Sequence, residues 1–157
     1  MYIIKEAEPS LEDSIKAYTA KGGNMATKFP FTSDKQKLLI KTIKKSKYTG
    51  DLYRGMWFSE KQWDKVYEIF FNEGSIWDFN LPLISFTKDK TRASSYGGGG
   101  DVFVKFHLNG KCTGLDISSL SIYPEEKEVI VSGENKFKII NSDMPRPGSF
   151  LINIKEI

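Results

Sequence analysis

The feature that most constrains the fold of this chain is the order in which two hydrophobic periodicities follow one another. Apolar residues recur at helical spacing in much of the first half, whereas the segment DVFVKFHL from Asp101 to Leu108 alternates strictly between two faces. One face carries Val102, Val104, Phe106 and Leu108. An alternation of period two predicts a strand with one buried face. Helices first and strands later predict an α+β fold whose sheet or sandwich is mostly antiparallel.

Capping and breaking residues set the expected boundaries of the elements. A helix is expected from Pro9 to the glycines that follow it, and a second helix is expected to have Ser33 or Asp34 as its N-cap. A third is expected to be capped by Ser59 and to end at Gly74, and the segment 88–96 also has a helical pattern. Strands are expected around 51–56, with a break at Gly55, and around 81–87, 101–108, 113–117, 129–131, 136–140 and 150–154.

Length and composition predict one domain with a substantial core. The chain has 157 residues, of which 39% are hydrophobic and 13% aromatic. We expect residues 1–50 to form a helical N-terminal part and residues 51–157 a β core. No apolar run approaches membrane length, and the N-terminus lacks the basic start and apolar stretch of a signal peptide. We expect a monomer that does not enter membranes and is cytoplasmic, or exported without a cleaved signal.

The counts of cysteine and histidine limit the chemistry that is expected. Cys112 is the single cysteine and His107 the single histidine, so neither an internal disulfide nor a Cys- or His-based metal cluster is expected. An enzyme with this sequence would rely on carboxylates, arginine and hydroxyls. The net charge of +3 is compatible with an anionic ligand or partner but does not require one.

The segment YPEEKEVIV, from Tyr123 to Val131, places two acids before an apolar run. If the chain is extended there, Glu126 and Glu128 share a face, because alternate side chains of a strand point the same way. Two such carboxylates repel each other and lose hydration, so the pair marks either a solvated strand end or a chemical site. A solvated strand end is the more common case for an isolated pair.

Two earlier strands also carry polar residues that need explanation. Arg54 lies in an apolar segment directly before Gly55, and a guanidinium there must pair, bind an anion or reach water at a strand edge. Ser85 and Thr87 alternate in the next strand, so their hydroxyls share a face and can donate to a carboxylate. On its own the second pattern is ordinary strand composition.

A glycine run forms the third unusual segment. Tyr96 stands directly before Gly97–Gly100. Such a loop can fold over a planar ligand, and its backbone N–H groups can hold phosphates. A plain surface loop is an equally good interpretation.

In order, these segments resemble the Arg-Ser-Glu class of mono-ADP-ribosyltransferases. The order is Tyr-Arg-Gly on one strand, Ser-x-Thr on the next, an aromatic residue with a flexible loop, and then Glu-x-Glu at the start of a strand. The resemblance extends from about Leu52 to Ile140. The family includes clostridial and insecticidal toxins and several phage enzymes. The resemblance implies N-terminal helices followed by a mostly antiparallel split β-sandwich of the ADP-ribosyltransferase type.

The resemblance also implies roles for individual residues. Glu128 would be the catalytic glutamate, oriented by Ser85, and Glu126 would handle the acceptor. The NAD-binding residues would be Arg54 on the phosphate, the Gly55 backbone on the nicotinamide amide and Tyr96 stacked on the ring, together with Tyr53, Thr87 and Arg92. The sequence departs from the family pattern at Phe86, which replaces a hydroxyl, and in the loop, where glycines replace a basic residue.

The implied activity is cleavage of NAD and transfer of ADP-ribose to an acceptor, most simply an arginine of a target protein. NAD is the substrate that is consumed, and no metal is expected. The protein would act as a toxin, a phage enzyme or a regulator, in a bacterial or phage-infected cell, and the sequence does not decide among these roles. Three alternatives remain open: a nucleic-acid acceptor, a non-catalytic nucleic-acid-binding module that uses the lysines from Lys35 to Lys47, and an NAD glycohydrolase without an acceptor.

Overall fold

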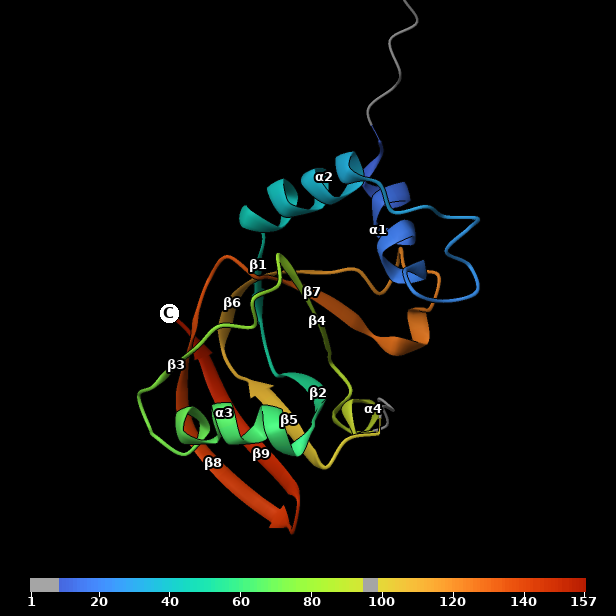
Figure 1. Cartoon of the computed structure of the whole chain (residues 1–157). Coiled ribbons are helices and arrows are strands. Elements are labelled where there is room, and N and C mark those ends of the chain that lie inside the picture. The colour runs from blue at the N-terminus through green and yellow to red at the C-terminus, as the bar shows by residue number, and fades with distance from the viewer. Residues whose placement is uncertain (1–8, 95–98) are drawn as a thin grey trace, which may run out of the picture.

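The computed structural model describes residues 9–94 and 99–157, and its two longest N-terminal elements are helices, as predicted (Figure 1). The helices are α1 (Leu11–Ala20), α2 (Ser33–Lys44), α3 (Glu60–Phe70) and α4 (Lys90–Ala93), with a 3₁₀ turn, η1 (Pro124–Glu126). The strands are β1 (Lys47–Thr49), β2 (Leu52–Phe58), β3 (Ile76–Trp77), β4 (Leu83–Thr87), β5 (Val102–Leu108), β6 (Lys111–Asp116), β7 (Glu128–Ser132), β8 (Phe137–Arg146) and β9 (Ser149–Glu156). No helix of the described residues is both long enough and apolar enough to cross a membrane.

The strands of the described chain are paired in the order β1-β6-β7-β4-β2-β5-β9-β8-β3. The pairs are antiparallel except for β5 and β9, which run parallel. A single residue pair, Tyr53 with Thr87, joins β2 to β4. The sheet therefore divides there into two halves, and the predicted α+β class with a mostly antiparallel split sheet is confirmed.

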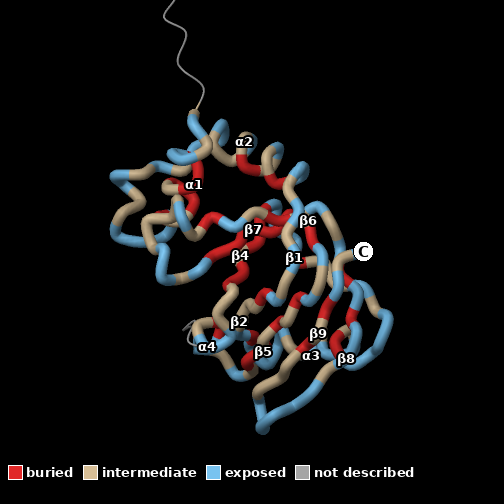
Figure 2. Tube along the Cα trace, turned by 180° about the vertical axis from the view of Figure 1, so that it is seen from behind, coloured by how far each residue is buried: buried red, intermediate tan, exposed pale blue. Residues whose placement is uncertain are grey.

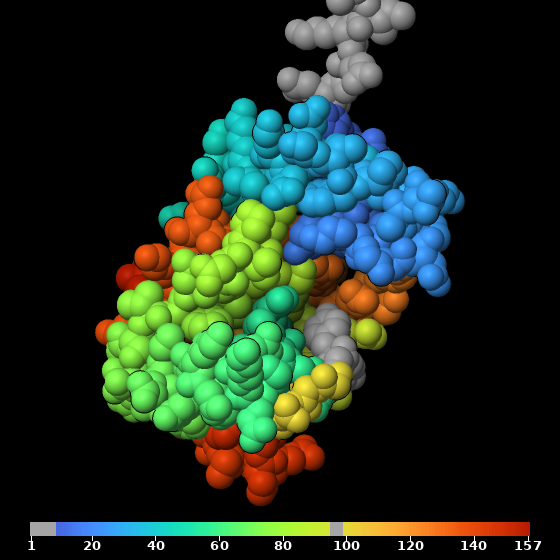
Figure 3. All heavy atoms as spheres, viewed as in Figure 1, coloured from blue at the N-terminus to red at the C-terminus, as the bar shows by residue number. Residues whose placement is uncertain are grey.

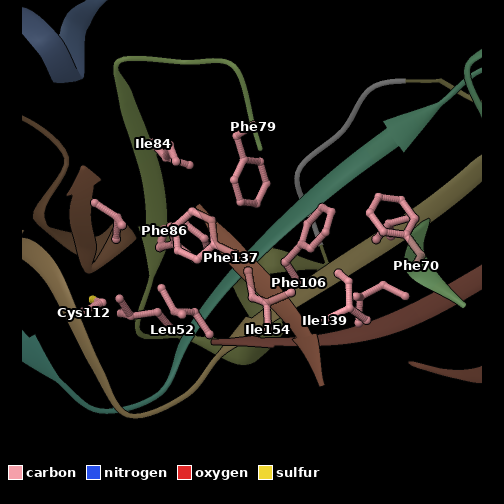
Figure 4. Close-up of a cluster of buried hydrophobic side chains, with 14 of the residues drawn as sticks. Leu52, Phe70, Phe79, Ile84, Phe86, Phe106, Cys112, Phe137, Ile139 and Ile154 are labelled. Atoms are coloured by element: carbon pink, nitrogen blue, oxygen red, sulfur yellow. The ribbon is translucent and has the colours of Figure 1, made fainter. Parts of the chain in front are cut away.

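The main core lies between the two halves of the sheet and is rich in aromatic rings (Figure 4). Ile84 and Phe86 reach it from β4, and Phe106 and Ile154 reach it from β5 and β9. The alternation predicted for 101–108 is confirmed, because Val104, Phe106 and Leu108 are all buried in this cluster. Phe79 packs edge-on against Phe86, Phe106 and Phe137, which ties the halves together.

A second core holds the N-terminal helices against the outer face of β4 and β7. Ile15 of α1 and Leu39 and Ile43 of α2 pack with Leu83 and Ile130 of the sheet. Strands β4 and β7 are therefore covered on both faces, and β7 is buried along its whole length (Figure 2). Helix α1 is thus held close to the strand ends that carry the predicted site.

Local capping explains most helix starts. Ser59 caps α3, as predicted, and the structure shows that it does so in a reciprocal capping box with Gln62. The N-cap of α2 is Thr32, so the prediction of Ser33 or Asp34 was wrong by one or two residues. Thr32 has an extended backbone and its hydroxyl accepts from the Lys35 N–H, while Ser33 is already helical.

Several strand boundaries differ from the prediction. Strand β2 does not break at Gly55 but continues to Phe58, because it pairs with β5 over its whole length. The short strands β1 and β3 were not predicted, and β8 runs on to Arg146 as one arm of a long hairpin with β9. Strand β1 falls within the part predicted to be helical and pairs with β6. Tertiary pairing, which local periodicity does not encode, extends or creates these strands.

Candidate active site

A cavity of about 510 Å³ lies where α1 meets the strand ends of the sheet. It is lined by Tyr18, Thr19, Lys21, Gly22, Gly23, Arg54, Gly55, Leu81, Leu83, Ser85, Tyr123, Glu126 and Glu128. In Figure 3 the blue helical region, the lime strand β4 and the orange segment before β7 meet there. The cavity therefore brings together five of the predicted site residues: Arg54, Gly55, Ser85, Glu126 and Glu128.

Glu128 is the first residue of β7 and is almost completely buried, with 6% of its surface exposed. Burial raises the pKa of its carboxyl group to about 7, and the nearby charge of Glu126 adds to this. A hydrogen bond from Ser85 and the positive charge of Arg54 lower the pKa in part. A solvated strand end is thus excluded for Glu128, and its carboxyl group titrates near neutral pH.

The hydroxyl of Ser85 is held by a residue that helical periodicity places among the apolar positions of the first helix. Tyr18 of α1 and Ser85 of β4 share a hydrogen bond of 2.6 Å between their hydroxyl oxygens. Burial raises the pKa of Tyr18 to about 12, so the phenol stays protonated. Tyr18 belongs to the site through the packing of α1 on the sheet, and no local motif marks it.

Arg54 lies at the junction of the two sheet halves. Its Nη1 donates a hydrogen bond of 2.9 Å to the carbonyl oxygen of Ser85, and its guanidinium lies over the ring of Phe79. Its charge also lowers the pKa of Glu128. Arg54 is therefore held by neighbouring groups within the cavity wall and is not a strand-edge arginine with its head in water.

Glu126 reaches the cavity by a different backbone path from the one expected. The prediction that Glu126 and Glu128 share a face of an extended strand was wrong, because Glu126 ends the turn η1 and Lys127 has a left-handed backbone with φ of 48°. Thr87 holds this turn by donating a 2.7 Å hydrogen bond to the Glu126 carbonyl oxygen. Burial raises the pKa of Glu126, while the charge of Arg92 lowers it.

The remaining predicted residues lie around the cavity or away from it. Thr87 is fully buried beneath the turn and does not line the cavity, and Arg92 acts on Glu126 from α4. Tyr53 does not line the cavity and stacks on His107. Tyr96 lies outside the described residues.

Gly55 has a structural reason to be glycine. A Cβ atom there would lie 2.1 Å from the Ala93 carbonyl oxygen and 3.0 Å from the Phe103 ring. The residue therefore lets α4 approach the strand closely. This contact explains the glycine without a ligand, although Gly55 also lines the cavity.

Among the residues that the structure describes, no group of three or more His, Cys, Asp or Glu side chains could hold a metal ion. The expectation of a metal-free reaction stays a prediction. The polar groups that line the cavity are carboxylates, hydroxyls and the cations of Arg54 and Lys21.

Comparison of this fold with solved structures gives consistent matches to one enzyme group. The ADP-ribosyltransferase HopU1 of Pseudomonas syringae pv. tomato matches 97% of this chain with a TM-score of 0.62 at 20% identity, and this chain covers 61% of HopU1. An ADP-ribosyltransferase of Clostridium botulinum matches 95% of this chain with a TM-score of 0.65 at 17% identity and is itself covered to 87%. The chain has the ADP-ribosyltransferase fold.

A third structure with the ADP-ribosyltransferase fold carries a small ligand. The ADP-ribosyltransferase Vis in complex with agmatine matches 94% of this chain with a TM-score of 0.56 at 20% identity and is covered to 69%. At the level of sequence, neither a protein-family model nor a curated protein matches the chain. The matches to known proteins are thus found by comparing three-dimensional structures and not by comparing sequences.

Proposed function

We propose that this protein is an NAD-dependent mono-ADP-ribosyltransferase that transfers ADP-ribose to an arginine of a target protein. The observation that carries this proposal is the buried carboxyl group of Glu128, which adjoins Ser85 and Arg54 in a cavity of an ADP-ribosyltransferase fold. An acid that a fold keeps buried at the edge of a cavity costs stability, and a catalytic role explains why it is there.

The volume and the charges of the cavity support NAD as its ligand. Its volume of about 510 Å³ lies within the range of roughly 300–1,000 Å³ that is usual for small-molecule sites. Arg54 and Lys21 supply positive charge for the pyrophosphate, and Lys21 also lies over the rings of Tyr18 and Phe31. Apolar side chains, Leu81 and Leu83, form part of the wall.

Glu128 would carry the chemistry of cleavage. NAD, when bound, supplies an ADP-ribosyl group and a nicotinamide leaving group, and positive charge builds on the ribose as their bond breaks. The ionised Glu128 would stabilise that charge and hold a ribose hydroxyl, while Ser85 fixes the direction of the carboxylate. Removing one such electrostatic contact typically costs about 10²–10³-fold in rate.

The pKa of Glu128 predicts how the rate depends on pH. Only the ionised carboxylate can stabilise the developing positive charge, and the pKa of about 7 means that a large fraction is protonated at neutral pH. We expect kcat/KM for NAD cleavage to rise as pH increases through about 7 and then to level off. A profile that is flat between pH 5.5 and 8.5 would contradict this role of Glu128.

Glu126 would act on the acceptor. A guanidinium is protonated at neutral pH and attacks poorly, so it needs a nearby carboxylate that pairs with it and takes its proton. Glu126 lines the same cavity as Glu128 and lies on a turn at its edge. Agmatine, which is bound to the related fold of Vis, carries the same guanidinium group as arginine. These observations support arginine as the acceptor.

A nucleic-acid acceptor has weaker support. The lysines of α2 would have to hold the phosphates, but α2 does not line the cavity, and Lys44 already pairs with Glu134 at 3.0 Å. Lys35 donates to the Pro30 carbonyl oxygen. Phage origin, monomeric state and cellular location stay predictions.

Incubation of the protein with labelled NAD and agmatine tests the proposal. We expect release of nicotinamide and label on agmatine from the wild type, and a loss of at least about 10²-fold in cleavage with Glu128→Gln. Glu126→Gln should lose transfer to agmatine and keep slow NAD hydrolysis. Glu125→Gln is the matched control, because Glu125 is exposed and does not line the cavity.

Each alternative has its own outcome in this assay. If the folded wild-type protein does not consume NAD, the non-catalytic binding module is the hypothesis that remains. Hydrolysis without transfer to agmatine or to protein would indicate a glycohydrolase. Wild-type turnover by a folded Glu128→Gln variant would remove Glu128 from the catalytic role.

A further inference from the structure

A second cavity, of about 600 Å³, lies apart from the candidate active site and shares no lining residue with it. It is formed by β2, β5, α4 and the turn between β8 and β9. The tip of the β8–β9 hairpin lies at the opposite end of the molecule from α1 and α2 (Figure 1). The proposed reaction makes no use of this cavity.

Three cationic side chains line this second cavity, each from a different element. They are Lys90 of α4, Lys105 of β5 and Arg146 of β8. Within residues 9–94 and 99–157, none of the three has a carboxylate within ion-pair distance. Burial lowers the pKa of Lys105, and the nearby charges of Lys90 and Arg146 lower it further.

One carboxylate lines the cavity and is already engaged. The Oδ2 atom of Asp101 accepts a 2.9 Å hydrogen bond from the Glu60 N–H at the first residue of α3. The lining of this cavity thus includes three positive side chains and one carboxylate, and that carboxylate is hydrogen-bonded to the first turn of α3. A cluster of this kind is stabilised by an anion.

The wall of the cavity is apolar and aromatic. Trp57, Phe103 and Phe150 line it, together with Pro145 and Pro147. Two contacts hold the rings in place: Phe150 stacks on Trp63, which does not line the cavity, at 4.7 Å, and Phe103 and Trp57 contact each other at 5.1 Å between centroids. A flat ring can pack on such a wall without disturbing the core.

We propose that this cavity binds a nucleotide 5′-phosphate, with the base on the aromatic wall and the phosphate between Lys90, Lys105 and Arg146. A phosphomonoester carries nearly two negative charges at neutral pH and offers three acceptor oxygens. It therefore matches three convergent donors better than a carboxylate with one charge. The cavity volume of about 600 Å³ suits a ligand of this size.

The proposal is independent of the proposed function. NAD contains a pyrophosphate diester and no phosphomonoester, so a site for a 5′-phosphate distinguishes AMP from NAD. The same chemistry is presented by a free mononucleotide and by the 5′-phosphorylated end of a nucleic-acid strand.

Calorimetry with the full chain tests the site, with AMP as the probe and ribose 5-phosphate as the probe without a base. We expect AMP to bind at least about fivefold more tightly than ribose 5-phosphate, because of the stacked base. Arg146→Gln and Lys90→Gln should each weaken AMP binding by about tenfold, because each loses a charge-assisted hydrogen bond. Lys65→Gln on the exposed face of α3 is the matched control and should bind AMP as the wild type does.

Arg54→Lys separates this site from the candidate active site. We expect it to leave AMP binding unchanged, and we expect Arg146→Gln to leave NAD cleavage unchanged. Loss of AMP binding in Arg54→Lys, with normal binding in Arg146→Gln, would place the nucleotide in the other cavity and overturn the proposal. Loss of NAD cleavage in every preparation would refute the proposed function and leave the AMP result intact.

A short single-stranded oligonucleotide, with and without a 5′-phosphate, identifies the source of the ligand. Tighter binding of the phosphorylated strand than of AMP assigns the cavity to a nucleic-acid end, and the reverse assigns it to a free nucleotide. If both strands bind equally well and more tightly than AMP, recognition of a phosphomonoester is contradicted. Absence of AMP binding at millimolar concentration, or equal affinities for AMP and ribose 5-phosphate, would overturn the proposal.

Discussion

At the scale of single residues, the burial that raises the pKa of the proposed catalytic Glu128 also lowers the stability of the folded protein. Its pKa of about 7 in the folded protein lies above the ordinary value of 4.5, because burial disfavours the charged form. Between these two pH values the folded state binds more protons than the unfolded state. The free energy of unfolding therefore falls as pH rises from about 4.5 to about 7, and the pKa difference corresponds to roughly 3 kcal/mol.

Glu128→Gln should consequently be more stable than the wild type at pH 8. The amide fills nearly the same space and carries no charge, so the gain should approach the roughly 3 kcal/mol that burial of the carboxylate costs. The gap should close as pH falls to about 4 or below, where the wild-type carboxyl is largely protonated in the unfolded state as well as in the folded state. Urea unfolding at both pH values measures it, with Glu125→Gln as control. Equal stabilities at pH 8 would show that the carboxylate is not penalised by burial.

Tyr18 offers a second test at this scale. Tyr18→Phe removes the hydroxyl that is hydrogen-bonded to Ser85 and should cost about 0.5–1.5 kcal/mol in the free energy of unfolding. Ser85 lowers the pKa of Glu128, so a less restrained Ser85 should raise the pKa seen in the kcat/KM profile for NAD.

A purely structural role of Tyr18 would lower stability without moving that profile. Tyr67→Phe on the exposed face of α3 serves as the matched control. An unchanged profile in Tyr18→Phe would limit Tyr18 to packing.

At the scale of elements, the end of β4 holds the site together. The Thr87 hydroxyl donates to the Glu126 carbonyl oxygen of η1 and accepts a 3.0 Å hydrogen bond from the Asp89 N–H. Asp89 in turn caps α4 with its side chain. One buried hydroxyl thus connects a strand end, the turn that carries Glu126 and the helix that carries Arg92.

Thr87→Val should disturb β4, η1 and α4, although valine has nearly the same shape as threonine. It leaves a buried carbonyl and an N–H without their partner, which typically costs about 1–3 kcal/mol. Transfer to agmatine should fall more than NAD hydrolysis, because Glu126 loses its support while Glu128 keeps its place in β7. Thr87→Ser restores the hydroxyl and should recover both properties. A Thr87→Val variant with wild-type stability would show that these hydrogen bonds contribute little.

At the scale of the whole molecule, the lysine-rich helix α2 lies apart from the candidate active site. Helix α2 carries exposed lysines, but it packs on α1, β6 and β7 and does not line the candidate active site. The net charge of +3 attracts anions in general and favours no acceptor.

Replacing Lys37, Lys41 and Lys45 together by glutamine should therefore leave transfer to a protein acceptor nearly unchanged. A nucleic-acid acceptor held by three such contacts would instead lose about 40-fold in affinity between 50 and 200 mM salt, and the triple variant would lose that dependence. The measurement is label transfer in bacterial lysate at both salt concentrations. Label on RNA or DNA that disappears in the triple variant would replace arginine as the acceptor.

Local signals in the sequence predicted a large part of this molecule. The alternation from Val102 to Leu108, the capping by Ser59 and the order of helices and strands depend on neighbouring residues, and the structure agrees with them. Local signals failed to predict two short strands and the backbone path that leads into β7. Strands β1 and β3 exist because distant strands pair with them, and the expected extended path from Glu126 to Glu128 is replaced by a 3₁₀ turn and a left-handed Lys127.

The sequence by itself determined the helices, most of the strands and the kinds of polar group available, because periodicity, capping and residue counts are local or compositional properties. The tertiary structure alone decided which of these groups meet. Tyr18 and Ser85 are 67 residues apart and join only because α1 packs on β4. The pKa of Glu128 likewise comes from burial and from charges on other elements, which no segment of the chain contains on its own.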